Sequence, residues 1–216
     1  MPSKQFVVMG LGRFGSAVGK ALSQMGYEVL GIDPNEDRVN EVSGVLTQAV
    51  VADGTDEAVL RDLGVRNFDC AVVAVGDIEA SIIMTVMLKE IGLKQVVAKA
   101  TGDLHGRVLT KVGADRVVYP EREMGVRVAQ NLVSANIVDF IELAPDYSIA
   151  ELVASPNLVG KSLRQLSLRQ KYGINVVAIK RGADINVTPT AEDVIEPNDV
   201  LVVIGKNECI RHLERQ

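Results

Sequence analysis

A glycine-rich turn near the start of the chain limits the possible folds more than any other feature. In VVMGLGRFGSAVG, residues 7–19, an apolar strand runs into Gly10, Gly12 and Gly15, and a helix of small residues follows. A strand, a GxGxxG turn and a helix in this order are typical of the phosphate-binding loop of a βαβ unit. The helix would offer unpaired N–H groups and the positive end of its dipole to the anion. We therefore expect a nucleotide-binding domain, with glycines that serve packing alone as the alternative.

Each glycine of the turn has its own expected role. Gly10 allows the tight turn, Gly12 lets the backbone approach a pyrophosphate, and Gly15 lets the helix pack closely on the strand. Arg13 is a cation at the start of a helix, where it opposes the helix dipole. A ligand phosphate explains that placement, and a solvated surface arginine is the alternative. The candidate phosphate-binding residues are Gly10, Leu11, Gly12, Arg13, Phe14 and Gly15.

Acidic residues follow the second and third predicted strands, and ligands of open α/β sheets bind beyond the carboxyl ends of the strands. Asp33 lies about 20 residues after the glycines, where an acid accepts hydrogen bonds from ribose hydroxyls and repels the 2′-phosphate of NADP. Asp53, followed by Gly54 and Thr55, would contact an adenine edge or a ribose. Thr55 could also cap the next helix, and the two roles are compatible.

The next three strand ends also carry charged residues. Asp77 follows the fourth strand and is expected to cap a helix rather than to contact a ligand. Lys99 lies near the end of the fifth strand, where its charge needs an anionic partner, either a phosphate or a carboxylate. Glu121 follows the sixth strand, and it either holds a metal ion or favours a helix N-terminus.

Short apolar runs alternate with helical patterns from the start of the chain to about residue 140. The expected strands are QFVVM, EVLGID, TQAVV, CAVVAV, QVVAKA and RVVYP, and the expected helices are Arg13–Met25, Glu36–Ser43, Asp56–Leu63, Ile78–Ile91 and Leu104–Val112. Apolar strands separated by helices predict a parallel sheet covered on both faces. With right-handed crossovers, this is a doubly wound, Rossmann-like α/β domain.

The remainder of the chain predicts a long helix and a small second domain. Pro120 suits a first helical turn, and the helix is predicted to run to about Phe140. Its apolar residues spread around more than one face, which packing against a partner subunit or burial between two domains would explain. The strands SIAELVA, INVVAIKR, DINVTP and DVLVVIG follow, with helices at Lys161–Lys171 and Asn207–Glu214 and a hairpin turn at 181–183. We expect three parts: a nucleotide-binding domain at 1–120, a crossover or dimerisation helix with its linker at 121–144, and an α+β domain at 145–216.

Composition excludes several classes of protein. The net charge is −5 with no basic excess, which argues against nucleic-acid binding and against a DNA-binding repressor. Two distant cysteines fit a reduced, cytoplasmic setting better than a disulfide framework. The N-terminal MPSKQF lacks a secretory core, and the apolar run SIIMTVML is too short to span a membrane.

Residues for catalysis are missing. His105 and His212 have no evident carboxylate partner in the sequence, no tyrosine is followed four residues later by lysine, and neither a GxxxxGK[ST] loop nor a Cys/His cluster is present. We therefore expect binding without turnover, so that the protein is not an enzyme. A small NAD-dependent oxidoreductase is the alternative.

Several linked motifs give the chain a resemblance to a known family. VVMGLGRFG, VLGID, DGTDEAVLRDLGVRNFDCAVVAVG, VVAKA and KVGADRVVYPEREMG resemble the RCK nucleotide-binding domain of the regulatory subunits of bacterial Ktr-type potassium uptake systems. The segment LVGKSLRQLSLRQKYGINVVAIKRGADINVTPTAEDVIEPNDVLVVIG resembles the RCK C-terminal (TrkA-C) domain. The resemblance covers essentially the whole chain. It implies cytoplasmic subunits that form dimers and an octameric ring on a membrane potassium channel of the KtrB/KtrD type.

The resemblance also implies ligands for the first domain. ATP or ADP, or in relatives NAD(H), would bind in the Rossmann crevice and switch the shape of the ring. Arg13 would sense the terminal phosphate of ATP, Asp33 would hold the ribose, and Asp53 would lie beside the adenosine. Glu121 matches the glutamate of the family's His-Pro-Glu segment, which helps to bind Mg²⁺ or another divalent cation. Tyr119 stands where the family has the histidine, which puts that cation in doubt.

For the second domain, the resemblance implies cyclic di-AMP between two subunits. The matching positions are Arg169, Ile174, Asn175, Val176 and Pro189. By residue chemistry alone, Arg169 is a surface helix residue and Ile174 belongs to the core.

Overall fold

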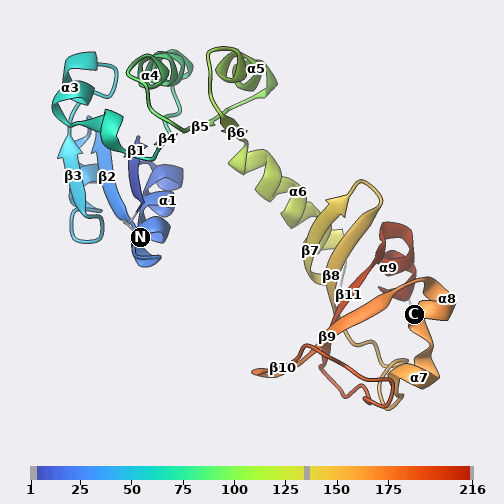
Figure 1. The fold of residues 1–216 in the computed structure, drawn as a ribbon. Helices are drawn as coiled ribbons and strands as arrows, with labels where there is room; N and C mark the ends of the chain where they lie inside the picture. Colours follow the sequence, from blue (N-terminus) through green and yellow to red (C-terminus); the bar gives the residue numbers. More distant parts are fainter. Residues whose placement is uncertain (1–3, 134–136, 215–216) are drawn as a thin grey trace. The chain divides into compact units, whose positions relative to one another are not determined.

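The computed structural model describes residues 4–133 and 137–214, which form the fold drawn in Figure 1. The chain divides into two compact units, Met1–Arg122 and Glu123–Gln216. Each unit has its own sheet and its own apolar core.

The first unit contains a six-stranded parallel sheet. Its strands are β1 (Gln5–Met9), β2 (Glu28–Asp33), β3 (Gln48–Val51), β4 (Cys70–Val73), β5 (Val96–Lys99) and β6 (Arg116–Val118). They lie in the order β3-β2-β1-β4-β5-β6, and every neighbouring pair is parallel. The predicted Rossmann-like sheet is therefore confirmed. The strand order reverses between β1 and β4, so ligands are expected beyond their carboxyl ends.

Helices cover both faces of this sheet, as Figure 1 shows. They are α1 (Arg13–Gln24), α2 (Glu36–Asn40), α3 (Glu57–Asp62), α4 (Ile78–Glu90) and α5 (Asp103–Lys111). One apolar cluster contains Val39 of α2 and side chains of α1, while the other contains Leu60, Leu88 and Leu109 of α3, α4 and α5. Strands buried on both faces explain the nearly continuous apolar runs in the sequence.

Short polar side chains set where three of these helices begin. Asn35, Asp56 and Asp77 accept hydrogen bonds from backbone N–H groups in the first turns of α2, α3 and α4. The expected cap at Asp77 is confirmed. The expected cap at Thr55 is wrong, because Asp56 takes that position and Thr55 bonds to Asp53 instead.

The helix after the sixth strand is shorter than the sequence predicted. Helix α6 comprises Pro120–Val133, and Ile137–Ala144 forms strand β7 instead of continuing the helix to Phe140. Residues 134–136 lie outside the described part of the chain. Strand β7 pairs antiparallel with β8 (Tyr147–Val153), which supplies hydrogen-bond partners for a segment rich in β-branched and aromatic residues.

The second unit contains a five-stranded antiparallel sheet in the order β10-β9-β11-β8-β7. Strands β9 (Asn175–Arg181) and β10 (Asp184–Asn186) form the predicted hairpin, with Gly182 in the left-handed conformation at its turn. Strand β11 (Val200–Lys206) and helix α9 (Asn207–Glu214) follow. The small α+β domain expected from the sequence is therefore confirmed.

The single helix predicted at Lys161–Lys171 is in fact two short helices. They are α7 (Leu163–Leu166) and α8 (Leu168–Tyr172), and Ser167 between them has φ +47°. Leu166 and Leu168 are both buried in the core of the second unit. Residues two positions apart face different sides of a continuous helix, so the break allows both leucines to reach one core.

An ion pair between the half-exposed Arg181 and a buried carboxylate ties β9 to the loop before β11. Asp199 is fully buried, and its carboxylate accepts hydrogen bonds from Arg181 Nε at 2.9 Å, Arg181 Nη2 at 2.8 Å and the backbone N–H of Glu196 at 2.8 Å. The Arg181 guanidinium holds the pKa of Asp199 below its usual value. Because the pKa is lower in the folded state, the stabilisation is present above the unfolded-state pKa of about 3.9 and is lost as the pH falls further.

We expect Asp199→Asn to destabilise the second unit by about 1–3 kcal/mol at pH 7, because Arg181 loses its charged acceptor. The variant should also lose less stability than the wild type between pH 5 and 3, a window of roughly 2 pH units around that unfolded pKa. Denaturant unfolding at each pH measures both effects. Asp184→Asn, an exposed change on the neighbouring strand β10, is the control. An equal acid sensitivity in all three proteins would contradict this account.

Candidate nucleotide-binding site

The residues predicted for the first ligand lie along the carboxyl edge of the parallel sheet. The backbone N–H of Leu11 bonds to Asp33 Oδ2 at 2.7 Å, and the N–H of Ala52 bonds to the Asp33 carbonyl at 3.2 Å. On the other side, the Lys99 ammonium lies 5.8 Å from the centre of the Phe14 ring and 2.6 Å from Glu121 Oε1. The fold thus brings together residues from the ends of five strands, β1, β2, β3, β5 and β6.

The glycine loop has the shape that the sequence predicted. Gly10 has φ +91°, and a Cβ there would lie 2.7 Å from Val75 Cγ1. A Cβ on Gly15 would lie 1.8 Å from the Gly10 carbonyl oxygen, so the helix approaches the loop too closely for any side chain. A Cβ on Gly12 would meet no atom within 4 Å, so the backbone at Gly12 borders open space that a phosphate could enter.

The N-terminus of α1 is suited to bind an anion. Gly12 occupies the N-cap without a side-chain cap, and the first turn has no acidic residue. The first N–H groups of the helix therefore lack side-chain partners. Arg13 is exposed, and its guanidinium makes no hydrogen bond or ion pair within residues 4–133 and 137–214. An unpaired cation beside unpaired N–H groups fits a polyphosphate.

Asp33 has a structural role that sequence reasoning missed. The residue is 1% exposed, and its carboxylate accepts hydrogen bonds from the N–H groups of Leu11 and Asn35. Arg38 Nη1 lies 3.5 Å from Asp33 Oδ2. The carboxylate thus holds the glycine loop in place. A ribose contact by Asp33 stays a prediction, in which a hydroxyl would share oxygens that already accept backbone bonds.

Asp53 presents a free carboxylate oxygen at the end of β3. Its Oδ1 accepts hydrogen bonds from the Thr55 N–H at 2.8 Å and the Thr55 hydroxyl at 2.7 Å. These bonds lower the pKa of Asp53 and keep it ionised. Gly54 is buried beneath side chains of the core, where a Cβ would lie 2.7 Å from Met9 Cε. Asp53 is exposed and rigidly held, as a contact for an adenosine requires.

Lys99 pairs with the carboxylate of Glu121, and a carboxylate is one of the two anionic partners expected from the sequence. Its side chain is 13% exposed, whereas that of Glu121 is 70% exposed. The hydrogen bond from Lys99 lowers the pKa of Glu121, so the glutamate is ionised at neutral pH. The pair joins the end of β5 to the first turn of α6.

A cavity of about 190 Å³, partly lined by Glu121, lies beside this pair. It is lined by Ala100, Thr101, Gly102, Asp103, Tyr119, Glu121 and Arg122. The Arg122 guanidinium stacks 3.9 Å above the centre of the Tyr119 ring and bonds to Asp103 Oδ1 at 2.6 Å. Sequence reasoning named Tyr119 only as the residue in place of the family's histidine, and it missed Asp103 and Arg122, although Arg122 directly follows Glu121.

A divalent cation receives little support from this chain alone. Within the described residues, no group of three or more His, Cys, Asp or Glu side chains is arranged to hold a metal ion. Glu121 supplies one carboxylate, and Lys99 is bonded to it. A hard cation that takes six or more oxygens would need phosphate oxygens to complete its coordination at Glu121.

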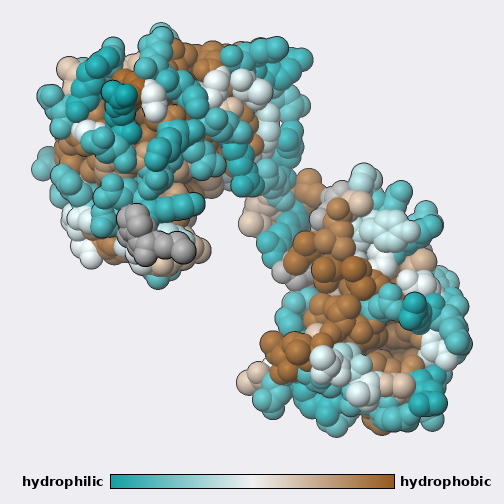
Figure 2. Space-filling view, viewed as in Figure 1, coloured by the Kyte–Doolittle hydropathy of each residue, from teal (hydrophilic) through white to brown (hydrophobic). Residues whose placement is uncertain are grey.

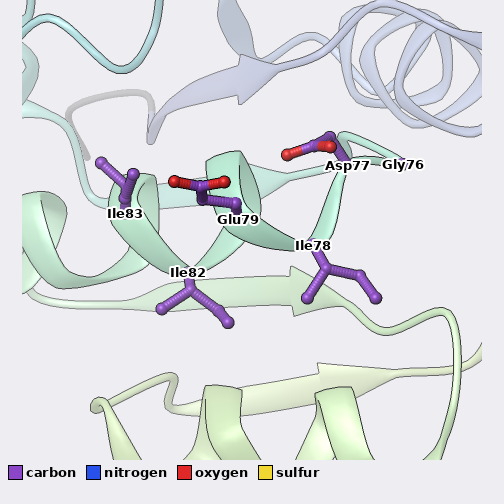
Figure 3. A pocket seen from close by; sticks show the side chains of 6 residues that line it. All are labelled: Gly76, Asp77, Ile78, Glu79, Ile82 and Ile83. Carbon is purple, nitrogen blue, oxygen red and sulfur yellow. The ribbon is translucent and has the colours of Figure 1, made fainter.

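A shallow depression lies at the N-terminal part of helix α4. It is lined by Gly76, Asp77, Ile78, Glu79, Ile82 and Ile83. Figure 3 shows Ile78 and Ile82 extending from the same side of the helix. Its lining is largely aliphatic and holds no cation, so this depression does not suit a phosphate.

The two histidines are not placed for proton transfer. His105 is buried, its Nδ1 accepts a hydrogen bond from the Thr101 N–H at 3.2 Å, and burial lowers its pKa. The ring of His212 lies 5.7 Å from that of Tyr172 in the second unit. In the described ranges, neither imidazole is bonded to a carboxylate.

The residues predicted for a second ligand lie in and around β9. Arg169 on α8 and Asn175 at the start of β9 are exposed, and Val176 and Pro189 are partly buried. Ile174 is fully buried in the core, so only its backbone is available to a ligand. A role of these five residues in binding stays a prediction.

Searches among known proteins matched both units. The TrkA-N domain family matches residues 6–120, and the TrkA-C domain family matches residues 148–216. The "Ktr system potassium uptake protein C" of Bacillus subtilis is 49% identical over 214 residues, covering 99% of this chain and 97% of that protein. The "Ktr system potassium uptake protein A" of the same organism is 44% identical over 215 residues, covering 99% of this chain and 97% of that protein.

Solved structures of GsuK also match. One of the GsuK channel has a TM-score of 0.71 at 19% identity over 98% of this chain, which spans 39% of the GsuK chain. One of GsuK bound to ADP has a TM-score of 0.51 at 26% identity, covering 60% of this chain and 34% of that chain. No helix in the described part of this chain is long and apolar enough to cross a membrane. Family models match both domains, and two relatives match over nearly their full length. The chain therefore belongs to the family of TrkA-N and TrkA-C proteins that includes the Ktr system potassium uptake proteins.

Proposed function

We propose that this protein is a nucleotide-sensing gating subunit of a Ktr-type potassium uptake system. It would bind ATP or ADP along the carboxyl edge of the parallel sheet. The two nucleotides would favour different shapes of the assembly, and this change of shape would gate a membrane potassium channel subunit. It would act from the cytoplasm, as a peripheral protein on the inner face of the membrane. Binding without turnover is part of the proposal, so the protein would not be an enzyme.

The unpaired Arg13 at the open N-terminus of α1 is the observation that carries this proposal. The N–H groups of the loop can hold the phosphates that ATP and ADP share. Arg13 extends from the same turn, is exposed and is not engaged by any described side chain, so it is available to a third phosphate. A guanidinium binds phosphate oxygens in a forked geometry with two hydrogen bonds.

Sensing requires that the two nucleotides interact differently with two shapes of the assembly. A ligand shifts a conformational equilibrium only by its difference in affinity for the two states. ATP and ADP differ in one phosphate, so a residue that contacts only that phosphate provides the difference. Asp53 and Asp33 would contribute the adenosine and ribose contacts common to both nucleotides. NAD(H) would use the same loop but would offer Arg13 no terminal phosphate.

The comparisons support this function at two levels. The relatives in Bacillus subtilis are potassium uptake proteins by name and align over nearly their full length. The GsuK structure bound to ADP supports an adenine nucleotide as ligand of the first unit. Nothing in either relative's description points to an oxidoreductase, and the buried His105 offers no proton donor beside a hydride acceptor.

Self-association is part of the proposal, as dimers that assemble into an octameric ring. The exposed apolar side chains in the described part of α6 include Met124, Val126, Val128 and Leu132. The second unit exposes Ile141, Leu143, Val177, Ile185, Val187 and Val194. Figure 2 shows hydrophobic surface on the second unit, around β7 and near β10. Exposed apolar surface of this extent favours burial against further copies of the chain.

Two more ligands are proposed with narrower support. A divalent cation, Mg²⁺ for example, would bind Glu121 together with nucleotide phosphate oxygens, since one carboxylate alone supplies too few ligands.

Cyclic di-AMP would bind the second unit, where Arg169 would contact its phosphates. The guanidinium of Arg169 is exposed and, in the described residues, has no bonded partner. Ile174, Asn175, Val176 and Pro189 would line that site.

Potassium flux tests the proposed function. Vesicles that contain the membrane subunit of the system are loaded with this protein, and potassium flux is measured with ATP, ADP or neither. We expect ATP to raise the flux severalfold above the level with ADP. Equal flux in all three conditions, with the nucleotides shown to bind by calorimetry, would contradict a gating role.

A further inference from the structure

The Lys99–Glu121 pair is unequal in its burial. The Lys99 side chain is 13% exposed and the Glu121 side chain 70% exposed, with 2.6 Å between Nζ and Oε1. A largely buried ammonium needs an anion at all times, because an unpaired charge in that position is costly. An exposed carboxylate loses little when it leaves, because water replaces its partner. Glu121 is therefore the member of the pair that can be replaced.

Lys99 lies within reach of the phosphate-binding loop. Its ammonium is 5.8 Å from the centre of the Phe14 ring, and Phe14 is the residue after Arg13 in the first turn of α1. Its flexible four-carbon stem lets the ammonium move between neighbouring anions. A phosphate at the N-terminus of α1 would thus compete with Glu121 for the same cation.

Glu121 lies in the first turn of α6, next to the boundary between the two compact units. It is the second residue of α6, and the two compact units divide directly after Arg122. Glu121 pairs with Lys99 and Arg122 pairs with Asp103, so ion pairs with the first unit form at this turn. Loss of the Glu121–Lys99 pair would remove one of these attachments.

We propose that Lys99 exchanges Glu121 for a phosphate of the bound nucleotide, so that nucleotide charge releases the first turn of α6. The proposal rests on the proposed function, since it assumes that a nucleoside di- or triphosphate binds the loop. It assigns Lys99 a second partner and makes Glu121 a built-in competitor of the ligand. In the exchange, Lys99 stays paired throughout, and Glu121 is released from Lys99 to water or, where a divalent cation is present, to that cation.

A double-mutant cycle measured by calorimetry on the full chain tests this exchange. Buffers contain EDTA, so that no divalent cation links Glu121 to the nucleotide. Lys99→Met should weaken ATP binding about tenfold, because a charge-assisted bond to phosphate is lost. Glu121→Gln should tighten ATP binding about threefold, because an exposed competing pair of modest strength is removed. In the Lys99→Met background, Glu121→Gln should change the affinity by less than about 1.5-fold, because the competition no longer exists.

Two controls separate this exchange from other effects. Adenosine lacks phosphates, so Glu121→Gln alone should leave its affinity unchanged; this comparison does not need the Lys99 variant to fold. Lys89→Met removes the lysine paired with Asp115 at 3.0 Å, at the opposite edge of the sheet, and should leave ATP binding unchanged.

An equal effect of Glu121→Gln with and without Lys99, or no effect in either background, would overturn the exchange while leaving nucleotide binding intact. Absence of ATP binding by the wild-type protein would overturn the proposed function, and the exchange with it.

Discussion

Gly15→Ala is expected to destabilise the first unit by about 3 kcal/mol or more, because the new Cβ collides with main chain rather than with a movable side chain. The Cβ would lie 1.8 Å from the Gly10 carbonyl oxygen and 3.0 Å from Ala74 Cβ. Relief requires α1 to move away from β1, which opens the core between them and displaces the phosphate-binding N–H groups. Thermal unfolding should shift down by about 10 °C, and nucleotide binding should be lost.

Gly12→Ala is the matched control for that prediction. The same methyl group at Gly12 meets no atom within 4 Å, so the fold should keep its stability within about 1 kcal/mol. The added carbon occupies the space that a phosphate would enter, so nucleotide affinity should still fall. Equal melting temperatures for the two variants would mean that the loop and helix are not packed as described.

Arg13→Ala is expected to abolish the preference for ATP over ADP. The side chain is exposed and makes no contact that stabilises the described fold, so the melting temperature should not change. A forked, charge-assisted contact to a terminal phosphate is worth about 1.5–3 kcal/mol, so affinity for ATP should fall roughly 10- to 100-fold. Affinity for ADP should fall less than about threefold. Calorimetric titration of both nucleotides measures the difference.

Two further arginine variants sharpen the result. Arg13→Lys keeps the charge but loses the fork, so its preference for ATP should be intermediate. Arg61→Ala removes an exposed arginine that pairs with Glu57 on α3, and it should bind both nucleotides as the wild type does. A purified Arg13→Ala protein that keeps the wild-type preference for ATP over ADP would contradict phosphate sensing by this loop.

Much of the geometry of the candidate nucleotide site could be predicted from the sequence because its determinants are local. Gly10 and Gly15 lie next to each other in a turn whose geometry depends on a few residues, and Asp77 caps the helix that begins directly after it. In the same way, the charge of Lys99 near a strand end required an anion. The sequence left open which anion, because Glu121 approaches it only through the pairing of β5 with β6.

The errors have a common cause, which is competition between local propensity and tertiary packing. The run from Pro120 to Phe140 has enough helix-forming residues to continue, yet pairing with β8 makes its last part a strand. The segment Lys161–Lys171 has helical spacing, yet it breaks at Ser167 so that Leu166 and Leu168 enter one core. In both cases, the deciding partner lies on another element of the second unit.

The amino-acid sequence alone predicted the parallel sheet and the glycine turn, because periodicity and turn chemistry act over a few neighbouring residues, and its linked motifs indicated the family. Phosphate binding by the loop and Arg13 stays a prediction. Tertiary structure alone decided that Asp33 is buried beneath the loop, that Glu121 occupies Lys99, and that Arg13 has no partner in the described chain. Each of these features depends on the distances between the ends of different strands, which are set only when the sheet forms. For this reason, the sequence predicted a site that holds phosphate, while the fold shows which of its charges are free to respond.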